Sequence, residues 1–233
     1  LPAATPDAGH LDFLTALFTA TSAVCVTGLS IIDVATELTT VGKVILVLLI
    51  QIGGLGIMVF SFFGMLAFRR KLSIAEKLTV SYMVSEDDMS GLFKALRVIV
   101  GSTFLVEAVS AGFLFLGFSR TMGASAKTLG FAAFHAVSAF CNAGFALFSN
   151  NLESFIGDPI ISLTISFTII LGGIGFAVMY DTVRKIKTET CNAFKKKKTT
   201  FFLPLNTQIV LIMTAGILFI SYAVFCLLKH THA

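Results

Sequence analysis

Two short segments combine small, hydroxylic and glycine residues beside long apolar stretches. Residues 17–29 read LFTATSAVCVTGL, and residues 133–145 read AFHAVSAFCNAGF. Glycine lets a backbone approach a ligand closely, and rings of backbone carbonyls can replace the water shell of a cation. These segments therefore predict walls of a cation filter, formed by the backbones of Val24, Cys25, Val26, Thr27 and Gly28 and of Phe140, Cys141, Asn142, Ala143 and Gly144.

The side chains of these two loops bear on the kind of ion. They are mostly apolar or small and include no carboxylate. Calcium sites in proteins are built largely from carboxylates, whereas carbonyl rings suit a dehydrated monovalent cation. For Cys25 and Cys141 we expect only the backbone to act, with each side chain a small buried residue. The four cysteines have no CxxC pair and no metal-ligand spacing, which argues against a zinc site or a disulfide framework.

The two segments belong to a longer internal repeat. Six identical residues recur 116 positions apart: Phe18 and Phe134, Ala20 and Ala136, Ser22 and Ser138, Ala23 and Ala139, Cys25 and Cys141, Gly28 and Gly144. Further on, IQIGGLGIMVF (50–60) and IILGGIGFAVM (169–179) share a GGxG core 119 positions apart. Similarity at one period indicates duplication.

The shared core supplies six glycines on the two apolar helices: Gly53, Gly54, Gly56, Gly172, Gly173 and Gly175. One interpretation is close packing between helices. The other is a flexible or tightly packed point on a pore-lining helix, and the sequence favours neither.

The composition is that of a helical membrane protein. The chain has 233 residues, of which 56% are hydrophobic and 13% charged, whereas a soluble domain has about 25% charged residues. The apolar runs are continuous and do not alternate, which indicates helices and not a barrel. Four spanning helices are predicted, at about 43–68, 92–118, 159–180 and 207–228, and Asp158 is expected to cap the third.

Two further apolar segments, 10–24 and 126–140, are too short to span a membrane. Each precedes a glycine-ended loop, which suggests a re-entrant helix that points its negative end at the membrane centre. The predicted repeat is thus an outer helix, a re-entrant helix, a filter loop and an inner helix.

Lysine and arginine are unevenly distributed along the chain. They cluster in 69–97 and 184–198, are absent from 1–42, and number two in 119–158. The positive-inside rule therefore places both basic loops in the cytoplasm of a multi-pass cell-membrane protein. The KKKK run (195–198) is interpreted as a topology signal and not as a nucleic-acid patch, and the capping-box spacing of SIAE (73–76) predicts a short helix there.

Two ionisable residues lie within apolar segments. Glu107 falls inside the second predicted span, where an ionisable residue is a functional candidate by default. Because that helix is an outer one, we expect a paired or packing role for it. His135, placed near the start of the second re-entrant helix, is expected to be a hydrogen-bonded interfacial side chain.

TSAVCVTGLS and HAVSAFCNAGF, each followed by GGLG or GGIG, resemble the Trk/Ktr/HKT superfamily of potassium transporters, closest to the membrane subunit of the bacterial Ktr and Trk systems. The resemblance covers essentially the whole chain. It implies four outer–re-entrant–inner (M1–P–M2) repeats around one pore, a homodimer, and a cytosolic nucleotide-binding ring as regulatory partner. It also implies one filter glycine per repeat, at Gly28 and Gly144, and glycine at both positions favours potassium over sodium.

On this resemblance the chain divides into five parts. Residues 1–68 form repeat one without its outer helix, 69–91 a cytoplasmic connection, 92–183 repeat two, 184–206 a basic cytoplasmic connection, and 207–233 the first helix of repeat three. The filters of repeats three and four are not in this sequence.

The expected function is potassium uptake, with K⁺, or K⁺ together with Na⁺, as the transported ion and with no covalently bound cofactor. The alternatives are a less selective Na⁺/K⁺ transporter and a membrane scaffold whose repeats pack without a pore. An enzyme is disfavoured because the spans contain no Ser/His/Asp, HExxH or paired-carboxylate set.

Overall fold

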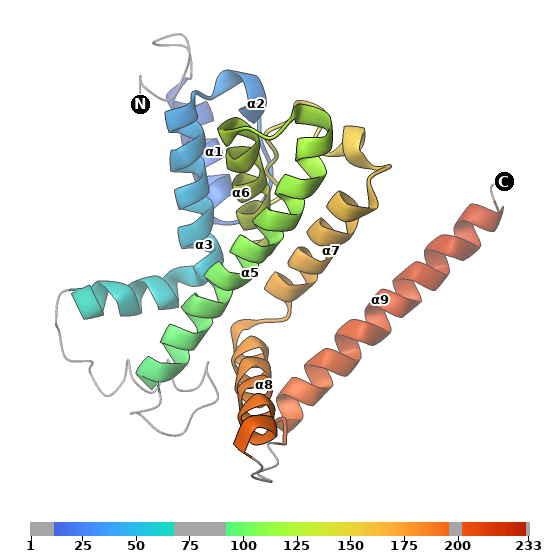
Figure 1. The fold of residues 1–233 in the computed structure, drawn as a ribbon. Helices are drawn as coiled ribbons and strands as arrows, with labels where there is room; N and C mark the ends of the chain where they lie inside the picture. Colours follow the sequence, from blue (N-terminus) through green and yellow to red (C-terminus); the bar gives the residue numbers. More distant parts are fainter. Residues whose placement is uncertain (1–11, 68–91, 196–201, 232–233) are drawn as a thin grey trace. The chain divides into compact units, whose positions relative to one another are not determined.

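The computed structural model describes residues 12–67, 92–195 and 202–231; in 57–67, 92–96, 191–195 and 229–231 it describes only the backbone. The predicted helix at 73–76 and residues 196–198 of the basic run lie outside these ranges. Helices and short turns account for the described architecture, with no strand in those ranges (Figure 1). Their bounds are α1 Phe13–Val24, α2 Val34–Glu37, α3 Thr40–Ala67, α5 Leu92–Met122, α6 Ala126–Phe140, η2 Glu153–Phe155, α7 Pro159–Gly173, α8 Phe176–Lys195 and α9 Leu205–Thr231.

The all-helical prediction is confirmed, and the two short helices lie where the sequence places them. Helix α1 ends at Val24 and α6 ends at Phe140, so the first residue of each predicted filter wall is the last residue of its helix. The predicted start of α7 is also correct, since the Asp158 carboxylate accepts the backbone N–H of Ile160 at 2.8 Å and Pro159 is the first helical residue. Proline fits this position because its missing N–H would have no helical partner there.

Two of the four predicted spans are continuous. Within the described ranges, Arg97–Met122 and Leu205–Leu228 are long and apolar enough to cross a membrane, and α7 with α8 makes a third if the pair is one span. The prediction of an unbroken third span over 159–180 is wrong, because the helix ends at Gly173 and resumes at Phe176. The break contains Gly175 with φ +94°.

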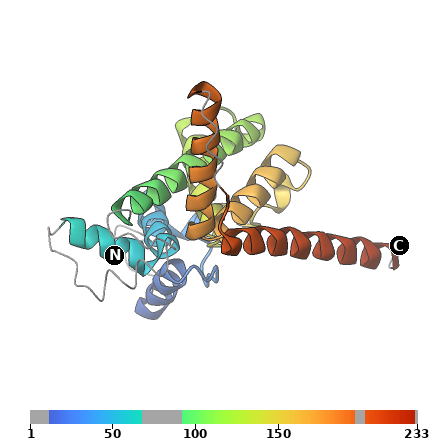
Figure 2. The same ribbon diagram turned by 90° about the horizontal axis from the view of Figure 1, so that it is seen from below.

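The first predicted span, 43–68, is likewise not straight. Helix α3 contains Gly56 with φ 77° and ψ 156°, and its apolar part before the break, Thr40–Gly56, is shorter than a span. Figures 1 and 2 show a bend in α3 at this point, where the part of the helix after the break runs in a different direction from the part before it. Only glycine adopts this conformation readily, so one residue type accounts for both breaks.

The chain forms two compact units. The first comprises residues 1–80 and 100–173, and the second comprises 81–99 and 174–233. In the second unit, α8 contacts α9, and the Thr207 hydroxyl donates a hydrogen bond to the buried Asp181 carboxylate. The apolar window of α9 is exposed along its whole length, as suits a surface that meets lipid or further protein.

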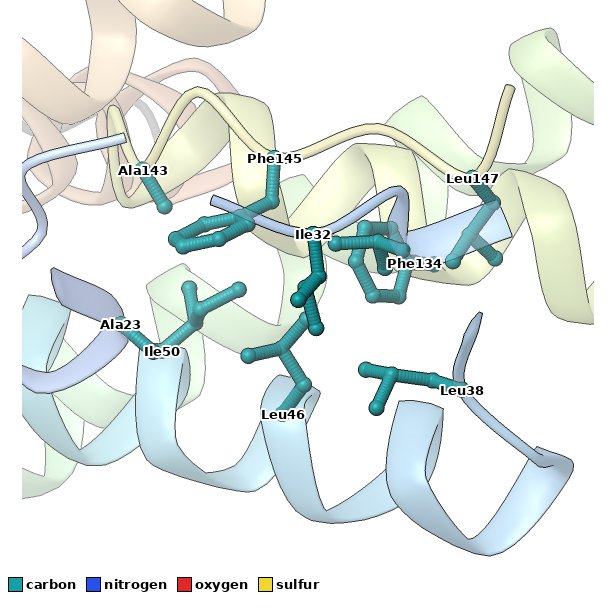
Figure 3. Packing of buried hydrophobic residues seen from close by; sticks show 10 residues of the cluster. Ala23, Ile32, Leu38, Leu46, Ile50, Phe134, Ala143, Phe145 and Leu147 are labelled. Atoms are coloured by element: carbon teal, nitrogen blue, oxygen red, sulfur yellow. The ribbon is translucent and has the colours of Figure 1, made fainter. Parts of the chain in front are cut away.

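The core of the first unit joins the two sequence-related segments. Figure 3 shows Leu46 and Ile50 of α3 packed toward Phe134 of α6 and toward Phe145 of the loop that follows α6. The full cluster comprises Ala23, Ile32, Val34, Leu38, Leu46, Ile50, Phe134, Ala143, Phe145 and Leu147. Burial of these side chains therefore holds the two candidate filter loops in one body.

A second cluster fixes α5 to α6 and α7. It contains Leu114 and Phe118 of α5, Ala132 and Ala136 of α6, Phe155 of η2 and Ile161 of α7. A Cβ added at Gly117 would lie 2.5 Å from Cγ1 of Ile161, so α5 and α7 approach closely there. The outer helix of the second segment is thereby packed against its own short and inner helices.

Above the first loop, the short helix α2 ties the two segments together. The Asp33 carboxylate caps α2 by accepting the N–H of Ala35 at 2.8 Å. A hydrogen bond from Ser149, which follows the second loop, is the main cause that lowers the pKa of Asp33. Asp33 is partly buried, and this hydrogen bond connects α2 to the residues that follow the second loop.

Candidate functional site

The two predicted filter loops begin with the same turn. Cys25 and Cys141 directly follow the two short helices, and their N–H groups donate to the carbonyl oxygens of Thr21 and Val137. Two residues further on, the N–H of Thr27 donates to the Ser22 carbonyl at 2.9 Å, and that of Ala143 donates to the Ser138 carbonyl at 2.8 Å. Donors and acceptors thus correspond at the 116-residue spacing.

The same correspondence holds for the backbone angles. Val26 and Asn142 have φ of 54° and 57°, and Gly28 and Gly144 have φ of 81° and 73°. The left-handed region disfavours a Cβ, and a β-branched residue there is an outlier. Each loop has two such residues separated by one position, so its backbone follows neither a helix nor a strand. Strain of this kind concentrates at functional positions.

The two loops touch each other at their glycines. A Cβ added at Gly28 would lie 2.8 Å from the Ala143 carbonyl oxygen and 3.3 Å from Cα of Gly144. A Cβ at Gly144 would lie 3.2 Å from Cα of Gly28. Neither loop can accept a side chain here without displacing the other, so glycine is required by contact as well as by φ.

The inner-helix glycines divide into two kinds. Cβ atoms at Gly53 and Gly172 would overlap the carbonyls of Val24 and Phe140, the last helical residues before each loop. A Cβ at Gly54 would overlap the Cys141 side chain, and one at Gly173 would lie 3.8 Å from Nδ2 of Asn142. These four positions pack against the loops. The other two, Gly56 and Gly175, have open space around them and positive φ, and they break the helices.

Behind the second loop, polar side chains hold the backbone in place. Ser138 donates from its hydroxyl to the Phe145 carbonyl at 2.7 Å. His135 lies in the second half of α6, not near its start as expected, and has 2% of its surface exposed. Its Nε2 accepts the N–H of Leu147 at 3.3 Å, its Nδ1 lies 2.7 Å from the Phe131 carbonyl, and its ring stacks on Phe148. The expected hydrogen bonding of His135 is thus correct and its expected location is wrong.

The corresponding serine of the first loop differs. Ser22 is buried, and its hydroxyl has no hydrogen-bond partner among the described residues. Leu29, which matches Phe145 in the repeat, is exposed, whereas Phe145 is buried. The first loop is therefore less firmly supported from behind than the second.

Glu107 is paired, as the sequence predicts. Its Oε1 accepts a hydrogen bond from Nε2 of Gln51 at 2.9 Å, which links α5 to α3. The expectation that both loop cysteines have buried side chains is wrong for Cys25, which is exposed, whereas Cys141 is half-buried. Within the part of the chain that the structure describes, no group of His, Cys, Asp and Glu side chains is arranged to hold a metal ion.

The sequence predicts each loop as one contiguous segment, and it predicts neither the left-handed backbone of Val26 and Asn142 nor the hydrogen bond of Gln51. A signal for Asn142 was present, since asparagine tolerates left-handed backbone better than most residues. Valine gives no such signal. Gln51 lies just before the GGLG core and belongs to no motif that would predict its hydrogen bond. That the ten loop residues form an ion filter stays a prediction.

Comparison with known proteins agrees with the membrane architecture. Residues 2–233 match the TrkH family model, which is described as a cation transport protein. Over 220 residues the chain is 37% identical to the Ktr system potassium uptake protein B of Vibrio alginolyticus, and over 196 residues 36% identical to that of Bacillus subtilis. These alignments cover 94% and 84% of this chain, and 46% and 44% of the relatives.

A third relative has a broader ion description. The chain is 33% identical over 204 residues to the potassium/sodium uptake protein NtpJ of Enterococcus hirae, with 87% of this chain and 45% of the relative covered. The chain thus spans somewhat less than half the length of these relatives. The family match over nearly every residue, together with the paired glycine-ended loops and apolar helices, shows that the chain belongs to the TrkH family of cation transport proteins.

Proposed function

We propose that the chain is part of the membrane subunit of a potassium uptake system, and that it contributes two walls of a filter that coordinates K⁺ through backbone carbonyls. One observation carries the proposal: two loops of matching backbone geometry meet at Gly28 and Gly144. Lipid-facing loops would leave backbone groups unpaired at a cost of several kcal/mol each. Convergence on a shared axis gives these carbonyls a ligand.

The loops can discriminate between ions because their positions are fixed. Their turns share one hydrogen-bond pattern, their bases rest on the inner-helix glycines, and each prevents the other from moving inward. Carbonyl groups held in this way replace the hydration of an ion according to its size and the number of carbonyls around it. This is transport chemistry, and we propose no enzymatic reaction.

A less selective transporter is the second candidate. The relative from Enterococcus hirae is named for uptake of both potassium and sodium. The unsupported hydroxyl of Ser22 leaves the first loop less constrained than the second. A looser wall discriminates less sharply between two ions of similar charge.

The wider assembly is proposed from the resemblance. It comprises four outer–re-entrant–inner repeats in one polypeptide, of which this chain supplies repeat two and parts of repeats one and three. It also includes a homodimer and a cytosolic nucleotide-binding ring, with the basic loops at 69–97 and 184–198 on the cytoplasmic side of the cell membrane.

The test replaces the loop glycines by serine in the complete coding sequence that carries residues 1–233. Gly28→Ser and Gly144→Ser add a Cβ that meets the opposite loop and that the positive φ disfavours. Strain of about 1–3 kcal/mol corresponds to a change in relative ion occupancy of roughly five- to a hundred-fold. Rb⁺ uptake into potassium-uptake-deficient cells is measured against competing K⁺ and Na⁺, with protein levels normalised.

Cys25→Ser and Cys141→Ser are the matched controls, because they change side chains of the same loops and leave the backbone intact. We expect the controls to keep the parental ion preference and the glycine variants to lose it. Parental uptake and preference in both glycine variants, with losses in the cysteine variants, would place the chemistry in the side chains and refute the carbonyl filter.

A further inference from the structure

A buried carboxyl group lies at the junction between the two sequence-related segments. Glu107 of α5 has 5% of its surface exposed. Its carboxylate accepts a hydrogen bond from the side-chain amide of Gln51. A carboxyl group in an apolar interior is costly to keep, which calls for a specific role.

The hydrogen-bond partner is placed to carry this contact to the loop. Gln51 and Gly54 are three residues apart on α3, so they share one face of that helix. A Cβ at Gly54 would overlap the Cys141 side chain, so Cys141 rests in the notch that this glycine leaves. The face of α3 that Glu107 holds is therefore the face on which the second loop rests.

The arrangement belongs to this junction and is not a feature of the repeat. The position that corresponds to Gln51 in the second segment is Ile170, which offers no hydrogen bond. Helix α5 is also joined to α7, where the Ser110 and Thr168 hydroxyls lie 2.7 Å apart. The Gln51–Glu107 hydrogen bond joins α5 to α3, the helix whose Gly54 receives the Cys141 side chain.

We propose that Glu107 is a positioning residue for ion discrimination: through Gln51 it fixes the rotation and height of α3, and thereby the seat of Cys141 and the carbonyls of the second loop. The proposal rests on the filter function proposed above. A helix free to rotate by a few degrees would shift the notch at Gly54, and the loop would follow because its side chain is interlocked there.

The experiment measures Rb⁺ uptake and its inhibition by Na⁺ in the complete coding sequence, for Glu107→Ala, Gln51→Ala and the exchanged pair Glu107→Gln with Gln51→Glu. We expect each alanine variant to lower the Rb⁺-over-Na⁺ preference by about two- to tenfold, the range that one buried hydrogen bond represents. The exchanged pair keeps a carboxyl-to-amide hydrogen bond between the same helices, and we expect it to restore most of the preference.

Thr103→Val is the control, because it removes a buried hydroxyl one turn from Glu107 on α5 that has no hydrogen-bond partner among the described residues. We expect this variant to leave the Rb⁺-over-Na⁺ preference unchanged. A purely structural role for Glu107 would make its alanine variant lose protein or maximal rate while keeping the preference of the Thr103→Val control, which would refute the proposal.

Poor folding of the alanine variants does not block the test. A folded exchanged pair with preference as low as that of the alanine variants would also refute the proposal. Parental preference in the Glu107 and Gln51 variants, with loss in Gly28→Ser and Gly144→Ser, would refute the positioning role alone. Parental preference in both sets would refute the filter function and this role together.

Discussion

Val26 has a backbone conformation that a β-branched side chain rarely adopts. Its φ of 54° matches the 57° of Asn142 at the equivalent place in the second loop, where the asparagine side chain tolerates the left-handed region. The turn therefore demands the conformation, and the first loop meets that demand with a poorly suited residue. The cost of such a residue is about 1–2 kcal/mol.

Val26→Asn should release this strain. We expect the variant to gain about 1 kcal/mol in the free energy of unfolding and to keep Rb⁺ uptake, because the loop carbonyls keep their directions. Thermal unfolding in detergent, alongside uptake in cells, measures both properties.

The reciprocal change, Asn142→Val, is the control and should lose a similar amount of stability. A lower melting temperature for Val26→Asn than for the parent would contradict this account. It would show that contacts of the valine side chain outweigh its backbone strain.

At the scale of the helical element, the inner helices combine two properties that the GGxG core alone could not separate. Gly53, Gly54 and Gly172 let α3 and α7 lie directly against the ends of the short helices and the loops. Gly56 and Gly175 have positive φ in open space and break the helices, two residues beyond Gly54 and three residues beyond Gly172. Close packing therefore occurs at one set of glycines and a helix break at the other, and that these helices line a pore stays a prediction.

Gly172→Ala tests the packing role. A methyl group there would overlap the Phe140 carbonyl, and backbone, unlike a flexible side chain, cannot move aside cheaply. We expect a loss of about 1–3 kcal/mol in stability from overpacking, together with reduced uptake.

Gly112→Ala is the matched control, because this glycine of α5 is exposed, helical and surrounded by open space. It should be neutral or stabilising by up to about 1 kcal/mol. Equal melting temperatures for the two variants would show that α7 does not need its close approach to Phe140.

At the scale of the whole molecule, the distribution of basic residues predicts the orientation in the membrane. Lysine and arginine cluster in 69–97 and 184–198, whereas residues 119–158, between the second and third predicted spans, contain two. The two short helices would then both enter from outside and point their negative ends at the membrane centre. In this orientation the negative ends of both short helices would stabilise a cation in the proposed filter.

Cysteine labelling in intact cells, on a cysteine-free background, measures the orientation. Lys187→Cys should resist a membrane-impermeant thiol reagent until the cells are opened. Ala124→Cys, at an exposed site between α5 and α6, should react at once. The opposite pattern would invert the topology and, with it, the direction in which the short helices enter.

The sequence by itself determined the membrane class, the helical fold, the ends of α1 and α6 and the cap at Asp158. These features follow from hydrophobicity, helix length and local capping, all of which act over neighbouring residues. The internal repeat also located the two loops, because duplicated segments keep their residue types.

Only the tertiary structure decided how those pieces meet. It showed that Gly28 and Gly144 touch, that Glu107 pairs with Gln51, that His135 is buried, and that α3 and the third predicted span are broken. The contacts depend on which residues distant in the chain become neighbours, and hydrophobic periodicity gives no information about that. The two breaks lie at Gly56 and Gly175, whose positive φ is not marked in the sequence because the neighbouring glycines of each GGxG core stay helical. The sequence alone does not distinguish a glycine that packs against another backbone from a glycine that breaks its own helix. Only the surrounding atoms and the backbone angles distinguish the two cases.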